Sequence, residues 1–193
     1  MSADANRHST DTVSVGSEVT YRTRIWISSF LFAGLVLGTC LAASAPAAFA
    51  ADSHVNRKAP EFVREDLNGT SIDLRSYRGK VVLLDFWATW CAPCQIEMPF
   101  FAAWQREYGP QGLQVIGISM DDDPGPVRRL VAKMKLNYPV AMGDATLGEQ
   151  YGGVLGLPLT YLIDRNGVVR TQFKGEIDVK TIEKQLKLML AHR

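Results

Sequence analysis

The chain has 193 residues and a formal net charge of +1, with 21 basic and 20 acidic residues. A chain of this length holds one domain with room for an extension, and the nearly balanced charge gives no basis for nucleic-acid binding. Hydrophobic residues make up 47% of the sequence, which is typical of a globular protein with a core and excludes a wholly disordered chain.

The N-terminal segment differs in composition from the rest. Residues 1–24 are polar and aperiodic, which predicts a disordered segment. An uncharged and largely apolar run follows over residues 25–51, directly after two arginines, and ends in the small-residue pattern Ala48-Phe49-Ala50. This order of a basic, an apolar and a small-residue region is typical of a secretory signal peptide.

Three interpretations of this apolar run stay open. It is a signal peptide that is removed, an uncleaved membrane anchor over residues 25–45, or a lipoprotein signal with Cys40 as the lipidated residue. Each of them carries the domain expected over residues 52–193 out of the cytoplasm, to the periplasm or another extracytoplasmic compartment. In such compartments thiol pairs tend to be oxidised.

The expected domain opens with a hairpin signal. Asn68-Gly69 separates two short segments, 62–66 and 70–74, that we expect to be strands. The continuous apolar and β-branched run Val81–Trp87 predicts a central strand buried on both faces. A helix is expected to follow from the cysteine pair to Tyr108, with an inward face marked at helical spacing by Ile96, Phe100, Ala103 and Trp104.

The second half alternates strands and helices. Strands are expected at 113–120, 138–142, 159–164 and 168–173, and helices at 126–136, 147–152 and from an Asp178 N-cap to Ala191. Strands separated by helices imply parallel pairing, whereas the turn Arg165-Asn166-Gly167 implies a closing antiparallel hairpin. The sequence therefore predicts an α/β fold with a mixed central β-sheet flanked by helices.

The two cysteines of this domain, Cys91 and Cys94, form a Cys-x-x-Cys motif between the central strand and its helix. Such a motif is a zinc half-site, a structural disulfide or a redox pair. Zinc requires about four nitrogen or sulfur ligands, and a disulfide closing so short a loop stabilises little. The strand-to-helix placement favours redox chemistry, because helix amides stabilise the first thiolate, and this chemistry needs no metal and no cofactor.

The segment Asp85-Phe86-Trp87-Ala88-x-Trp90-Cys91-x-Pro93-Cys94 resembles the active-site segment of thioredoxin. Further matches are to TlpA/ResA-like thiol-disulfide oxidoreductases, exported members of the thioredoxin superfamily, and cover about residues 55–190. They are Ala59-Pro60-x-Phe62, Leu74-x-x-Tyr77-Arg78-Gly79-Lys80, Glu97 and Gly156–Asp164. The resemblance implies a thioredoxin-like fold with an N-terminal β-hairpin and a central insertion at residues 123–142.

The resemblance also implies roles for the residues of the motif. Cys91 would be the exposed attacking thiol, and Cys94 would resolve the mixed disulfide. Asp85 matches the buried carboxylate of thioredoxin, which exchanges a proton with the second cysteine, although many TlpA/ResA relatives lack an acid there. Glu97 matches the family's active-site glutamate. Two alternatives stay open: Asp85 as a purely structural buried group, and Glu97 as a solvated residue on the helix surface.

The partner-binding residues follow from the same resemblance. Pro158, with Leu157 before it, matches the cis-proline of the superfamily, whose loop offers backbone groups to an extended partner peptide. Trp90 and Pro93 beside the cysteines would complete this substrate-binding surface.

The function implied is reduction of protein disulfides outside the cytoplasm, with the dithiol recharged by a membrane thiol-disulfide electron donor. By resemblance, the clients would be haem-site thiols of apocytochrome c or copper-site cysteines of oxidase assembly. Two alternatives are a peroxiredoxin-like peroxidase and a copper chaperone. The first needs a cysteine preceded by threonine and proline at fixed spacing, and the second needs Cys-x-x-x-Cys with a distant histidine; neither pattern is found in the sequence.

Overall fold

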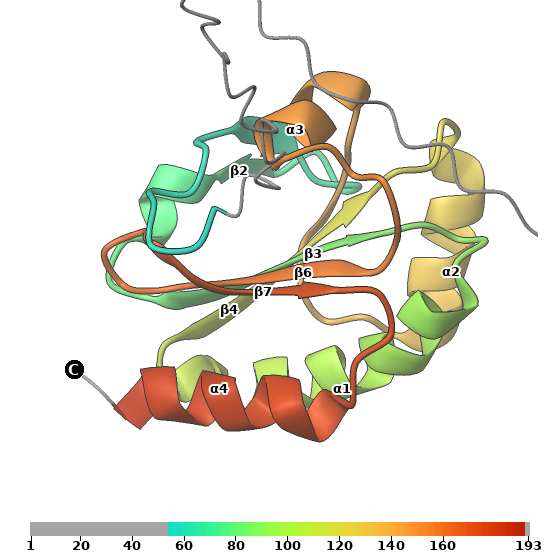
Figure 1. Ribbon diagram of the computed structural model, residues 1–193. Helices are drawn as coiled ribbons and strands as arrows, with labels where there is room; N and C mark the ends of the chain where they lie inside the picture. Colours follow the sequence, from blue (N-terminus) through green and yellow to red (C-terminus); the bar gives the residue numbers. More distant parts are fainter. Residues whose placement is uncertain (1–53, 192–193) are drawn as a thin grey trace, which may run out of the picture. The chain divides into compact units, whose positions relative to one another are not determined.

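The computed structural model describes residues 54–191 (Figure 1). The expectations for residues 1–24, for the apolar run 25–51 and for Cys40 lie outside the described residues. Within residues 54–191, no helix combines the length and the apolar composition needed to cross a membrane.

The domain opens with the expected hairpin. Strands β1 (Val63–Glu65) and β2 (Ser71–Asp73) pair antiparallel as a two-stranded sheet. The turn uses Gly69 at φ +82°, a backbone conformation that glycine adopts without steric cost. The carboxylate of Asp66 accepts hydrogen bonds from two backbone amides of the turn. A short 3₁₀ helix, η1 (Leu74–Tyr77), follows β2.

The central sheet has five strands in the order β5-β4-β3-β6-β7. The pairs β3–β4 and β4–β5 are parallel, and β3–β6 and β6–β7 are antiparallel, so the expected mixed sheet is confirmed. Every residue of β3 is buried, because strands cover it on both sides and helices or loops cover both faces. The strand bounds are β3 Val81–Trp87, β4 Leu113–Ser119, β5 Val140–Met142, β6 Leu159–Ile163 and β7 Val169–Lys174.

Helices cover the sheet on both faces, as Figure 1 shows. One core contains side chains of α1 (Ala92–Tyr108), α2 (Pro124–Met134) and α4 (Val179–Ala191). The other contains side chains of α3 (Ala145–Gln150), β2 and η1. A single 3₁₀ turn, η2 (Gly109–Gln111), links α1 to β4. The segment expected to be the central insertion forms α2 and the edge strand β5 between β4 and α3.

Successive residues of β3 point to opposite cores. Leu83 and Trp87 lie in the core under α1, whereas Leu84 and Phe86 lie in the core under α3. This alternation puts Asp85 on the face covered by α1 and α4, which is also the face of the two cysteines.

The inward face of α1 differs from the sequence prediction. Ile96 and Phe100 are 63% and 44% exposed, whereas Trp104 is buried as expected. The buried residues of this helix are Cys94, Glu97, Met98, Phe101, Ala102, Trp104 and Tyr108. Two apolar stripes coexist on α1, and spacing alone does not tell which one faces the sheet. The stripe that faces the sheet is the one that contains the buried Cys94, Met98 and Phe101.

Segments near the start of the domain cover parts of both sheet edges. At β5, the backbone amide of Leu67 donates to the carbonyl of Val140, and Asp66 forms an isolated bridge with Ala141. At the start of β7, Lys58 bridges to Val168, and the amide of Val169 donates to the carbonyl of Arg57. The first residues of the domain thus contact one edge of the sheet, and the turn of the hairpin contacts the other.

Candidate active site

The cysteine pair lies at the N-terminus of α1, immediately after the central strand. Cys91 is the N-cap of α1, and the backbone amide of Cys94 donates to its sulfur at 3.3 Å. The two residues form a disulfide whose Cα atoms are 5.3 Å apart. Free amides and the helix dipole at this position stabilise a thiolate on Cys91 when the bond is reduced. The pair can therefore exchange between disulfide and dithiol with a reactive first sulfur.

The exposure of Cys91 differs from the expectation of an exposed thiol. Cys91 is only 4% exposed, and Cys94 is fully buried. The cause is its N-cap position, which turns the sulfur back over the first turn of α1 and onto Cys94. The two cysteines still differ in the expected direction, because Cys91 keeps a small exposed fraction and Cys94 has none.

The loop before the cysteines is held by Asp121, one of three consecutive aspartates for which the sequence indicates only a solvated turn before a helix. Its carboxylate accepts from the backbone amide of Thr89 at 2.8 Å and from the Thr89 hydroxyl at 2.5 Å. The Ser119 hydroxyl donates to the same carboxylate at 2.8 Å. On the other side, the Gln95 side-chain amide donates to the Thr89 carbonyl at 2.7 Å. These bonds fix the approach of the chain to Cys91.

We expect Asp121→Ala to destabilise the domain by about 1–3 kcal/mol, because it removes the acceptor of a backbone amide and of a hydroxyl. Urea unfolding of the oxidised protein measures this loss. The matched control is Asp122→Ala next to it, whose exposed side chain should change the stability by less than about 0.5 kcal/mol. Equal effects of the two substitutions would contradict the anchoring role of Asp121.

Asp85 lies buried on the sheet face that also carries the cysteines. It is 2% exposed, and its Oδ1 accepts from the hydroxyl of Thr160 on β6 at 3.0 Å. Burial raises the pKa of Asp85 to about 8; the Thr160 hydrogen bond opposes this shift and the charge of Glu97 adds to it. A carboxyl with this pKa can both take and give a proton near neutral pH. Its side chain thus has the burial and the titration that the proposed proton exchange requires.

Glu97 is also buried, so the alternative of a solvated residue on the helix surface is wrong. The residue is 3% exposed, and neither carboxylate oxygen meets hydrogen-bond geometry with any group of residues 54–191. Burial raises its pKa to about 7, while the nearby backbone of Ile177 lowers it and the charge of Glu176 raises it. Glu97 lies at a pocket of about 230 Å³ beside the cysteines, lined also by Pro93, Ile96, Phe100, Glu176, Ile177, Asp178 and Val179.

The expected cis-proline is confirmed, since the Leu157–Pro158 bond is cis. Leu159 pairs with Phe86 in the antiparallel β3–β6 register. Pro158 therefore lies at the end of the sheet where β3 leads into the cysteine loop. Trp90 in that loop is 71% exposed, as a docking residue would be.

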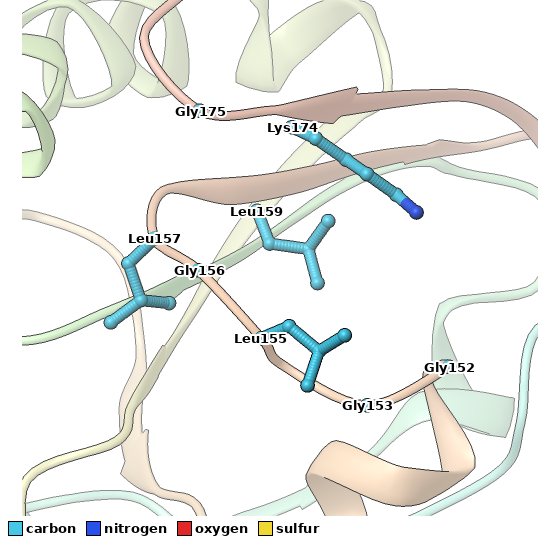
Figure 2. A pocket seen from close by; sticks show the side chains of 8 residues that line it. All are labelled: Gly152, Gly153, Leu155, Gly156, Leu157, Leu159, Lys174 and Gly175. Carbon is cyan, nitrogen blue, oxygen red and sulfur yellow. The ribbon is translucent and has the colours of Figure 1, made fainter. Parts of the chain in front are cut away.

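Figure 2 shows a second pocket on the loop that precedes β6. It has a volume of about 320 Å³, and its lining is mostly glycine and leucine with Lys174 at one side. Leu157 contributes to this pocket, and Leu155 beside it is 99% exposed. The lining residues are Gly152, Gly153, Leu155, Gly156, Leu157, Leu159, Lys174 and Gly175. The loop thus offers apolar surface just before the cis bond.

Sequence matches agree with this geometry. The profile of the AhpC/TSA family matches residues 55–172. A thiol-disulfide oxidoreductase ResA of Bacillus thuringiensis is 36% identical over 133 residues, covering 69% of this chain and 77% of the relative. The ResA of Halalkalibacterium halodurans is 32% identical over 171 residues, covering 87% of this chain and 96% of the relative.

Solved structures are similar in fold. A Chlorobium tepidum protein proposed to be the thiol:disulfide interchange protein DsbE is 34% identical with a TM-score of 0.65, and the match covers 69% of this chain and 95% of that one. A second thiol:disulfide interchange protein of the thioredoxin family from Chlorobium tepidum is 27% identical with a TM-score of 0.64, at the same coverage of 69% and 95%. With a cysteine pair at the start of α1 in a thioredoxin-like fold, this chain belongs to the AhpC/TSA family and, within it, to the ResA-like thiol-disulfide oxidoreductases.

Proposed function

We propose that this oxidoreductase works outside the cytoplasm as a reductant of protein disulfides. The observation that carries the proposal is the Cys91–Cys94 disulfide at the N-terminus of α1, on the sheet face that holds the buried carboxyl of Asp85. The residues between the cysteines, Ala92 and Pro93, are uncharged and include no histidine, which strong disulfide oxidants of the superfamily carry there. This composition favours a reducing role.

The reaction proceeds in two exchanges. The Cys91 thiolate attacks one sulfur of the client disulfide, forms a mixed disulfide and releases the other client sulfur as a thiolate, which takes a proton. Cys94 then gives its proton to Asp85 and attacks the Cys91 sulfur. This second step forms the Cys91–Cys94 disulfide and releases the second client sulfur. Two electrons pass from the protein to the client in each turnover.

The client binds over the cysteine loop and the cis-proline loop. Apolar side chains flank the pair on both sides: the exposed Trp90 and the half-buried Pro93 beside the cysteines, and the half-buried Leu157 before the cis bond. An extended peptide passing Pro158 would place its cysteine against Cys91. Apolar contacts of this kind suit unfolded or partly folded client proteins.

The remaining parts of the proposal concern location and partners. The N-terminal region directs the domain across the membrane, either as a removed signal or as an anchor over residues 25–45. A membrane thiol-disulfide carrier then returns two electrons to the Cys91–Cys94 disulfide. The clients are cysteine pairs of cytochrome c maturation or of oxidase copper-site assembly, by analogy with the family.

The reduction potential of the Cys91–Cys94 couple tests the direction of transfer. We expect a value near that of thioredoxin, about −270 mV, when the purified protein is equilibrated against thiol buffers. A value near that of DsbA, about −120 mV, would overturn the proposal and make the protein a disulfide donor. Fast peroxide consumption, or tight copper binding by the dithiol form, would instead favour the two alternative functions.

A further inference from the structure

The loop between α3 and β6 has two apolar sides. Figure 2 shows the side chains of Leu155 and Leu159 on one side of this loop and that of Leu157 on the other. All three residues line the pocket of about 320 Å³. Leu157 also packs against the core that contains both cysteines. The pocket is therefore continuous with the surface over which the client is proposed to bind.

This pocket is apolar and open to solvent. Leu155 is 99% exposed, whereas Leu159 is buried. Four of the eight lining residues are glycines, so few side chains occupy the space between the leucines. A single exposed leucine is common on protein surfaces. An exposed leucine beside a pocket that other leucines line is part of a larger apolar surface, and such surfaces mark binding sites.

Lys174 is the charged residue of the pocket. It is the register partner of Leu159 at the end of β7, and Figure 2 shows its side chain on the same side as Leu155 and Leu159. Lys174 is exposed and forms no ion pair within residues 54–191. None of the lining residues is acidic. The pocket thus combines apolar walls with one positive charge, which a carboxylate would complement.

The backbone of the loop can hold an extended chain beside the pocket. The amide of Gly175 donates to the carbonyl of Pro158 at 2.8 Å, which ties the end of β7 to the loop. Gly156 and Leu157 make no backbone hydrogen bond within residues 54–191. An extended peptide can pair with such free groups. Its side chains alternate in direction, so some of them would point toward the pocket.

We propose that this pocket selects the client sequence. It takes an apolar side chain of about the size of leucine from the client, and Lys174 pairs with a carboxylate next to that side chain. The inference rests on the proposed passage of an extended client over the cis-proline loop. It adds the kind of sequence beside the client cysteine that the protein prefers. The pocket contributes to recognition only, because the chemistry takes place at the sulfur atoms.

A set of peptides tests this selection on the full-length reduced protein. Each peptide carries one cysteine as a mixed disulfide with an aromatic thiol. The Cys91 thiolate attacks the peptide sulfur, a disulfide between Cys91 and the peptide forms, and the aromatic thiol leaves as a coloured thiolate. The peptides carry Leu-Glu, Ser-Glu or Leu-Lys at successive positions on either side of the cysteine.

At one of these positions we expect a clear preference for Leu-Glu. Leucine should raise the second-order rate constant about tenfold over serine, because its side chain leaves water for the pocket. Glutamate should raise it about threefold over lysine, since the pairing with Lys174 is exposed to solvent. About 1 M NaCl should remove the preference for glutamate and keep the preference for leucine.

Gly156→Leu tests the apolar part. Gly156 lines the pocket, its φ is not in the left-handed region, and a Cβ atom there would meet no heavy atom within 4 Å. A leucine at this position can therefore occupy the pocket without backbone strain, and it should abolish the preference for leucine in the peptide. The matched control is Gly156→Ala, which adds only a methyl group and should keep most of that preference.

Lys174→Glu tests the charged part. It should reverse the preference, so that Leu-Lys peptides react about threefold faster than Leu-Glu peptides. The matched control is Lys184→Glu, which changes the net charge equally at an exposed position of α4. This control should keep the preference for glutamate. Each result is a ratio of two rates measured on one protein, so a partial loss of folded or reduced protein cancels.

Three results would overturn the inference. They are the absence of a leucine preference at every peptide position, a leucine preference that survives in Gly156→Leu, and an unchanged charge preference in Lys174→Glu. The assay follows only the first exchange, so the ratios do not depend on the net direction of electron transfer. An error in the proposed direction would appear in the reduction potential, whereas an error about the pocket would appear only in these ratios.

Discussion

Cys91→Ser should abolish thiol-disulfide exchange, with a loss of at least about a thousand-fold, because no other group can supply the attacking sulfur. Cys94→Ser should keep the first attack and lose the second. It should therefore accumulate a mixed disulfide with the client through Cys91. The measurement is insulin-disulfide reduction for activity, with non-reducing electrophoresis and mass spectrometry to identify trapped adducts.

The matched control for this pair is Cys40→Ser, the third cysteine of the chain, which lies outside the Cys-x-x-Cys motif. It should keep the activity of the unmodified protein. Two results would refute the assignment of Cys91 as the nucleophile. One is normal turnover by Cys91→Ser, and the other is a mixed disulfide with the client formed through Cys94 in that variant. The experiment shows which cysteine attacks first. Exposure alone does not show it, because both cysteines are almost completely buried in the disulfide form.

Asp85→Asn should change the pH dependence of stability. The pKa of Asp85 is raised from about 3.8 to about 8 in the folded protein. Between these values the folded state holds a proton that the unfolded state has released, so stability falls as the pH rises from about 4 to about 8. Each pH unit is worth about 1.4 kcal/mol, so the total cost above pH 8 reaches at most about 6 kcal/mol.

Asparagine has nearly the same shape and no charge to bury. The variant should match the unmodified protein at pH 4 and exceed its unfolding free energy by several kcal/mol at pH 9, while its second exchange slows about a hundredfold. Urea unfolding of the disulfide form at a series of pH values measures the first effect. Glu97→Gln is the comparison variant. The pKa of Glu97 is raised to about 7, so the gain in unfolding free energy from this substitution should reach its full value about one pH unit lower than the gain from Asp85→Asn. Parallel stability curves for Asp85→Asn and the unmodified protein would contradict the buried, proton-binding carboxyl.

Local patterns in the sequence predict much of the fold. The run Val81–Trp87 is continuous and β-branched, and it is the fully buried central strand. The turn signals Asn68-Gly69 and Arg165-Asn166-Gly167 each join a pair of antiparallel strands. These features depend on neighbours along the chain, so one sequence is enough to see them. The cis bond before Pro158 followed from the family resemblance, since a proline alone does not reveal its isomer.

The failures concern contacts between distant segments. The prediction of the inward face of α1 was wrong because the helix carries two apolar stripes, and packing against the sheet determines which of them is buried. Glu97 belongs to the covered stripe, and the sequence left open whether it is buried because it did not identify that stripe. The bonds from Thr89 to Asp121 join residues 32 positions apart. The hydrogen bond from Thr160 to Asp85 depends on the register that pairs these two residues across β3 and β6. Neither arrangement leaves a local pattern in the sequence.

The covered edges of the central sheet have a consequence for the proposed reduction of unfolded client chains. An unfolded polypeptide can extend a sheet by pairing with free backbone groups at its edge, and this pairing leads to aggregation. Here the hairpin contacts β5, and residues near Lys58 contact the start of β7. The rest of β7 carries charged residues, Arg170 and Lys174, which oppose such growth. The molecule can therefore hold a non-native chain at its sulfur atoms without becoming a template for its misfolding.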